Sequence, residues 1–132
     1  MKKIINFFMS TCLTTIVYYL GGLDTALKTL LILMVLDYIT GVCKAIVNKE
    51  INSIIGAKGI IKKVGYLVIV AVSVLLDAVV GDTGAIRNLV VYFFVANEGI
   101  SILENWGKMG LPLPKKIMEV LEQIKNENGG KE

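Results

Sequence analysis

The sequence contains no histidine and only two cysteines and two prolines, and these shortages disfavour several classes of function. Histidine is the commonest general base and a common metal ligand, so its absence argues against most acid–base and metal-centred catalysts. Cys12 and Cys43 lie 31 residues apart inside apolar runs, a spacing that forms neither a metal motif nor an extracellular disulfide framework. We therefore predict a protein that is not an enzyme and that binds no cofactor or metal.

Charge is scarce as well. Charged residues make up 19% of the 132 residues and hydrophobic residues make up 55%, whereas soluble domains carry roughly 25% charged residues. The net charge of +3 is small and the basic residues are not gathered on one polar helix face, so nucleic-acid binding is not expected. Apolar runs cover residues 4–20, 26–47, 64–80 and 85–103. This pattern predicts an all-α membrane protein with about four transmembrane helices, arranged as two hairpins.

The segments between the runs are of two kinds. The turns 21–25 and 81–84 are glycine-rich and carry an acid but no base. The connector 48–63 is basic, and its two glycines predict a short segment in the membrane interface rather than one long helix. The residues predicted to contact the membrane interface are Lys49, Lys58, Lys62, Lys63 and Trp106.

The distribution of basic residues predicts the orientation of the chain. Twelve of the 14 basic residues lie near the N-terminus, between residues 44 and 63, or after residue 105. Under the positive-inside rule, we expect a multi-pass protein of a bacterial cytoplasmic membrane with both termini in the cytoplasm. Residues 1–105 are predicted to form the transmembrane domain, and residues 106–132 a cytoplasmic amphipathic helix and a frayed tail.

Polar side chains inside the apolar runs are the candidate functional residues, because an ionised carboxylate is expensive in lipid. Asp37 shares a helix face with Gly41, Lys44 and Ala45. The small residues Gly41 and Ala45 on this face allow two helices to approach closely. The residues predicted to serve self-association or a pore are Asp37, Gly41, Lys44, Ala45, Ser73, Asp77, Asn97, Glu98 and Ser101. Helix packing within one chain explains the Gly41 and Ala45 face as well as self-association does. The alternative for Asp37 is a carboxylic acid that burial keeps protonated and that has no function.

Two further acids lie in the second predicted hairpin. Asp77 and Arg87 lie at similar distances from its tip, so they are predicted to form an ion pair that lowers the cost of both charges. Glu98 lies nearer the middle of the membrane and has no evident basic partner in its own hairpin.

Several short blocks along the chain resemble the holin family of phages and prophages of Gram-positive bacteria, notably clostridia, which serves phage lysis and toxin secretion. The first block is Leu-Asp-Tyr-Ile-Thr-Gly at 36–41, and Ala45, Lys49, Ser53, Gly56, Gly59, Lys62, Lys63 and Asp77 follow at matching separations. The last blocks are Asn97–Asn105 and Gly110–Pro114. The resemblance covers nearly the whole chain after residue 25.

The resemblance implies a small membrane protein that assembles with itself in the lipid bilayer into large lesions. An endolysin, or in some relatives a toxin, then leaves the cytoplasm without any required direct contact with the holin. The main competing prediction is a small proton-coupled transporter that uses an intramembrane carboxylate. A third is a non-lytic membrane protein whose C-terminal helix docks a partner.

Overall fold

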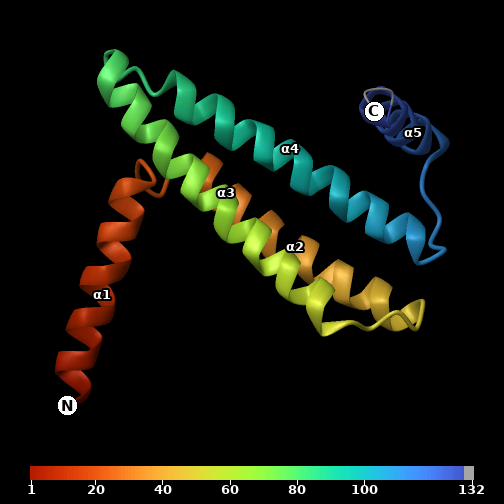
Figure 1. The fold of residues 1–132 in the computed structure, drawn as a ribbon, viewed down its shortest axis with the longest axis horizontal. Helices are drawn as coiled ribbons and strands as arrows, with labels where there is room; N and C mark the ends of the chain where they lie inside the picture. Colours follow the sequence, from red (N-terminus) through yellow and green to blue (C-terminus); the bar gives the residue numbers. More distant parts are fainter. Residues whose placement is uncertain (130–132) are drawn as a thin grey trace.

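The computed structural model describes residues 1–129, and within them the chain folds into five helices and no strand. In chain order these are α1 (Lys2–Tyr19), α2 (Thr25–Val47), α3 (Ser53–Val80), α4 (Ala85–Lys108) and α5 (Lys115–Gly129). Helices α2, α3 and α4 run side by side as a three-helix bundle, whereas α1 leaves one end of it and α5 lies near the other (Figure 1). The prediction of an all-α protein is confirmed.

The bundle is held by a narrow apolar core. Helix α4 packs most extensively on α2 and less on α3, while α2 and α3 touch each other at few positions. The buried apolar side chains are Leu20, Leu27, Leu30, Met34, Tyr66, Val70, Val91 and Phe94. They recur every three or four residues along each helix, which is the spacing of a single buried stripe.

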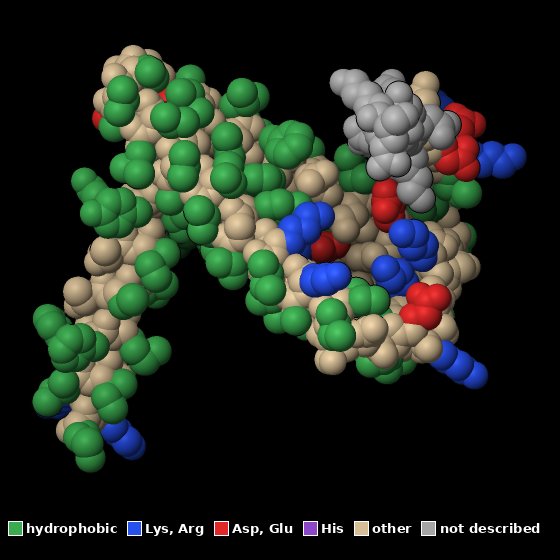
Figure 2. Space-filling view, viewed as in Figure 1, with side chains coloured by type: hydrophobic (Ala, Val, Ile, Leu, Met, Phe, Trp, Pro, Cys, Tyr) green, Lys and Arg blue, Asp and Glu red, His purple; other side chains and the backbone are tan. Residues whose placement is uncertain are grey.

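Most of the remaining apolar surface faces outward (Figure 2). Val79 of α3 is 83% exposed and Leu89 of α4 is 71% exposed, as expected of side chains that contact lipid rather than water. Helices α2, α3 and α4 are each long and apolar enough to cross a membrane. The chain is therefore a membrane protein. Helix α1 has 18 residues and is not among these three helices, so the fourth span stays a prediction.

The turn between α1 and α2 is built by glycine. Gly21 and Gly22 have φ values of +84° and +92°, a region that favours glycine over residues with a Cβ atom. None of the residues of α1 is buried, and the chain becomes buried only at Leu20, where it joins the bundle.

The predicted connector 48–63 is wrong in its extent. Helix α3 begins at Ser53, so residues 48–52 alone link it to α2, and the glycines at 56 and 59 lie inside a helix. The start is fixed by Asn52, whose side-chain oxygen accepts a 2.8 Å hydrogen bond from the Ile54 amide. One such cap and a long apolar continuation offset the ~1 kcal/mol that each glycine costs in a helix. Lys58, Lys62 and Lys63 are therefore helical residues.

The C-terminal helix α5 begins immediately after Pro114, inside the range 106–132 in which the sequence predicts an amphipathic helix. Prolines at 112 and 114 cannot continue α4, and Trp106 closes this bend by donating a hydrogen bond of 3.2 Å from its indole nitrogen to the Pro112 carbonyl oxygen. The cytoplasmic location of α5 and the interfacial role of Trp106 stay predictions. Most of the tail predicted to fray, residues 130–132, lies outside the described residues.

Candidate functional site

Three charged side chains, one from each helix of the bundle, meet inside it. The Lys63 ammonium nitrogen lies 2.7 Å from Oδ2 of Asp37 and 2.5 Å from Oε2 of Glu98. The Glu98 side chain is 2% exposed, and those of Lys63 and Asp37 are 13% and 16% exposed. Because the three residues come from α2, α3 and α4, this ion cluster is enclosed by the bundle.

Amide and hydroxyl groups complete the surroundings of Asp37. The Asn105 side chain of α4 donates hydrogen bonds of 3.2 Å to Oδ1 of Asp37 and 3.1 Å to the Thr40 hydroxyl. Thr40 in turn donates to the Asp37 carbonyl oxygen at 3.0 Å. We call Lys63, Asp37, Glu98, Asn105 and Thr40 the Lys63 cluster. Among the described residues, no buried side-chain polar atom lacks a hydrogen-bond partner, so these charges are held without an unsatisfied group.

The neighbouring turn of α4 carries a second, uncharged contact to α3. The Asn97 amide donates a hydrogen bond of 3.1 Å to the hydroxyl of Tyr66. The Tyr66 ring stacks on Phe94 with ring centroids 4.1 Å apart. This contact fixes the rotation of α3 against α4, which places Lys63 opposite Glu98.

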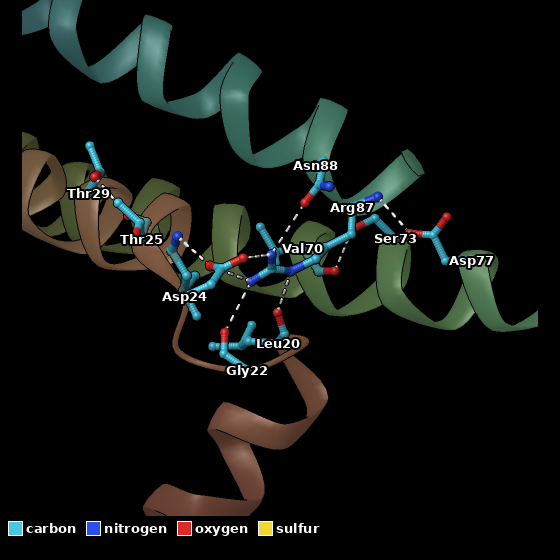
Figure 3. A network of polar contacts seen from close by, with 11 residues as sticks. Leu20, Gly22, Asp24, Thr25, Thr29, Val70, Ser73, Asp77, Arg87 and Asn88 are labelled. Atoms are coloured by element: carbon cyan, nitrogen blue, oxygen red, sulfur yellow. Dashed lines mark hydrogen bonds and ion pairs between the residues drawn. The ribbon is translucent and has the colours of Figure 1, made fainter. Parts of the chain in front are cut away.

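A second group of polar contacts lies at the opposite end of the bundle, around Arg87 of α4 (Figure 3). The guanidinium donates from Nε to the Leu20 carbonyl oxygen at 2.8 Å and from Nη2 to the Gly22 carbonyl oxygen at 3.1 Å. It also forms a two-point ion pair with Asp24, with distances of 2.6 and 3.1 Å. Asp24 caps α2 by accepting a hydrogen bond from the Leu27 amide. Arg87 thereby ties the turn between α1 and α2 to α4.

The close fit at this turn explains why it requires glycine. A Cβ atom on Gly21 would lie 2.6 Å from Nε of Arg87 and 3.2 Å from a methyl group of Val74. The guanidinium beside Asp24 also lowers the pKa of that carboxyl below its usual value, because its hydrogen bond favours the charged form.

The predicted ion pair between Asp77 and Arg87 is not formed between their side chains. The Asp77 carboxylate accepts hydrogen bonds of 3.0 and 2.8 Å from the backbone amides of Ile86 and Arg87, so it caps the first turn of α4. The Arg87 side chain extends the other way, toward the turn between α1 and α2 (Figure 3). Arg87 and its contacts with Asp24, Asp77, Leu20 and Gly22 are called the Arg87 cluster below.

The structure turns most of the other predicted site residues inward. Ser73 is buried and donates a hydrogen bond of 2.6 Å to the Val70 carbonyl oxygen. Gly41 faces α4, since a Cβ atom there would lie 3.7 Å from the Asn105 amide nitrogen. Lys44, Ala45 and Ser101 are half-buried and line a groove between α2 and α3.

Sequence reasoning missed the partners rather than the acids. Lys63 was expected at the membrane interface, and Glu98 was expected to lack a basic partner, yet Lys63 reaches it from the other helix of the same hairpin. Asn105 and Thr40 were not singled out, although an amide and a hydroxyl near intramembrane charges are a usable signal. Within residues 1–129, no three acids or thiols gather where a metal ion could bind.

Residues 14–126 match the family model described as the bacteriophage holin family. The chain belongs to this family. It is 41% identical to an uncharacterized 14.9 kDa protein of Clostridium perfringens, over 96% of this chain and 99% of that protein. It is 34% identical to a probable holin of Bacillus phage phi105, over 86% of this chain and 84% of the phage protein. No solved structure matches this holin-family protein.

Proposed function

We propose that this protein is a holin that assembles with itself in a bacterial cytoplasmic membrane into lesions. Through them an endolysin, or a toxin, would leave the cytoplasm. Membership of the holin family over most of the chain, together with a relative named as a probable holin, carries this proposal. Four spans with both termini in the cytoplasm are part of it, with α1 as the short first span. The lipid bilayer and further copies of the chain are the partners that it requires.

The bundle offers a physical basis for a dispersed early state. A single chain hides Asp37, Glu98 and Lys63 from lipid and leaves an apolar exterior, so it is compatible with hydrocarbon on its own. Without a hydrophobic drive between helices in lipid, association depends on packing and on polar contacts. In the proposed assembled state these polar residues exchange partners between copies or face water. The Lys63 cluster is then the contact that must open or rearrange.

Inducible expression in a bacterium tests the proposal, with a cytoplasmic endolysin expressed alongside. Viability, enzyme release and the amount of protein in the membrane fraction are followed over time. Abrupt, delayed death with release of the enzyme is the expected result. Sustained growth with the protein verified in the membrane would contradict a holin-type lesion.

A proton-coupled transporter is the second candidate, favoured by the buried Glu98 carboxylate and its lysine partner near the middle of the bundle. Proteoliposomes separate the two functions. A transporter would move protons under a pH gradient while retaining an entrapped protein marker. A holin would release the entrapped marker together with the small solutes.

A further inference from the structure

A groove of about 730 Å³ lies where α2 ends and α3 begins. It exists because α2 and α3 both pack on α4 and touch each other at few positions. Figure 2 shows a hollow on this part of the surface with basic side chains around it, and the basic residues of the groove are all lysines. The Lys63–Asp37 ion pair lines one part of the groove, and the rest comes mainly from the last turns of α2 and the first turns of α3.

The lining carries two lysines that no carboxylate neutralises. Among the side chains that the structure describes, Lys44 and Lys62 form no ion pair. Lys62 lies over the Tyr66 ring at 5.6 Å, a contact that leaves its charge in place. Asp37 is already bound by Lys63, so Glu50 is the remaining acid in the lining. Glu98, the second partner of Lys63, is buried and does not line the groove. The lining residues themselves therefore comprise three lysines and two acids, with Lys44 and Lys62 as the lysines available to a ligand.

Apolar side chains stand beside these ammonium groups. Ile51, Ile55 and Ile60 line the groove and are 75%, 65% and 51% exposed. A surface that combines exposed isoleucines with lysine head groups is unfavourable in water. It is complementary to a molecule that has a phosphate at one end and hydrocarbon at the other.

The length of α3 places this groove at the level of lipid headgroups. At about 1.5 Å per residue, its 28 residues extend about 42 Å, whereas the hydrocarbon core is about 30 Å thick. The excess of about 12 Å corresponds to about eight residues. It belongs at the N-terminal end, which contains Lys58 and is followed closely by Lys62, because the other end of α3 is uniformly apolar from Leu75 to Val80 apart from the capping residue Asp77. The first turns of α3 and the groove thus lie in the interfacial region.

We propose that this groove binds one anionic phospholipid, with Lys44 and Lys62 on the phosphate and the isoleucines along the upper part of an acyl chain. Nothing in the family assignment requires such a site, and it does not depend on lesion formation. Lipid bound between α2 and α3 fills the space that their sparse contact leaves open.

The proposal is tested on the purified full chain in dodecyl maltoside by counting bound lipids with native mass spectrometry. Phosphatidylglycerol is expected to bind at one molecule per chain, in preference to phosphatidylcholine. The double variant Lys44→Gln/Lys62→Gln is expected to bind about twenty-five-fold more weakly, because each lysine near an anionic lipid contributes about fivefold. The control variant Lys2→Gln/Lys3→Gln removes the same charge from α1 and is expected to bind as the unmodified protein does.

A second pair of variants changes shape without changing charge. Gly59 lines the groove, and a Cβ atom there would meet open space, so Gly59→Leu fills the groove while the helix is kept. It is expected to weaken phosphatidylglycerol binding about tenfold or more. Gly65→Leu, on the same helix outside the groove and equally open, is the matched control. Circular dichroism and gel filtration verify that all variants are folded.

Three results would overturn the proposal. Binding that survives both Lys44→Gln/Lys62→Gln and Gly59→Leu would show that the lipid lies elsewhere. An equal loss of phosphatidylglycerol binding in Lys2→Gln/Lys3→Gln would show that the lipid is attracted by the overall charge of the protein and not by this groove. Competition by inorganic phosphate at the lipid's own concentration would indicate a site for a free anion rather than a phospholipid.

Discussion

The two polar clusters differ in what their cations bind. Arg87 binds two backbone carbonyl groups and Asp24, whose side chain is 48% exposed at the edge of the bundle. Lys63 binds only side chains, Asp37 and Glu98, and lies deep between the helices. The planar guanidinium fixes several groups in one geometry, whereas an ammonium is a point charge on a flexible stem that can change partners. The Arg87 cluster is therefore suited to be a permanent joint, and the Lys63 cluster to rearrange.

Removal of Lys63 should give the largest effect on stability. Lys63→Met leaves two carboxylates buried without a cation, and we expect a loss of about 3–5 kcal/mol in the free energy of unfolding. Denaturant titration in detergent micelles, followed by circular dichroism, measures this loss. The control Lys58→Met removes an exposed lysine from the same helix and should change stability by less than about 0.5 kcal/mol.

A triple variant sharpens this prediction. Lys63→Met combined with Asp37→Asn and Glu98→Gln removes all three charges and should recover much of the lost stability. The reason is that the attraction within a buried ion cluster is largely offset by the cost of removing its charges from water. If the triple variant is as unstable as Lys63→Met alone, packing of the lysine stem rather than its charge holds the helices together.

The next largest effect is expected at the other cluster. Arg87→Lys keeps the charge but loses most of the fork that binds the Leu20 and Gly22 carbonyl groups, which should cost about 2 kcal/mol. The turn between α1 and α2 should also become more sensitive to limited proteolysis. Leu89→Val, at an exposed position two residues further on, controls for general disturbance of the start of α4. Unchanged cleavage would show that Arg87 does not hold this turn.

Asp37→Asn should change function more than stability. The amide retains the shape of the carboxylate and leaves Lys63 paired with Glu98 alone, so we expect a stability change within about 1 kcal/mol. Under the proposed holin function, the onset of lysis should shift while membrane insertion stays intact. Time courses of optical density and membrane fractionation after induction measure both. Unchanged timing would remove Asp37 from the mechanism.

The smallest expected effect is the dependence of stability on pH at the Arg87 cluster. The pKa of Asp24 in the folded protein lies below its ordinary value of 3.8, with the hydrogen bond from Arg87 as the largest cause. The ion pair therefore contributes fully above pH 3.8, and this contribution is lost as the pH falls through the lower folded pKa. Asp24→Asn should remove that part of the acid dependence of the melting temperature. Asp82→Asn, in the other exposed turn, should leave it unchanged.

The helices could be predicted from the sequence because long apolar runs and turn glycines are local signals. The acids Asp37, Asp77 and Glu98 were recognisable for the same reason, since a charge in an apolar run stands out. Their partners were not, because Lys63 and Glu98 are 35 residues apart and their meeting depends on the rotation of α3 against α4. The start of α3 was missed since the Asn52 cap outweighs two glycines. The ion pair between Arg87 and Asp24 was missed for the same reason as that of Lys63 and Glu98, because the two residues are 63 positions apart.

One lysine shared by two carboxylates leaves the Lys63 cluster with a formal excess of one negative charge when all three groups are ionised. In a ring of chains this excess repeats once per subunit at the same depth. In the proposed assembled state, such a ring of negative charge would attract cations from the solution that fills it. Under the proposed holin function, the charge of this ion cluster would therefore favour passage of cations over anions in the first narrow openings, before a lesion is wide enough for charge to lose its influence.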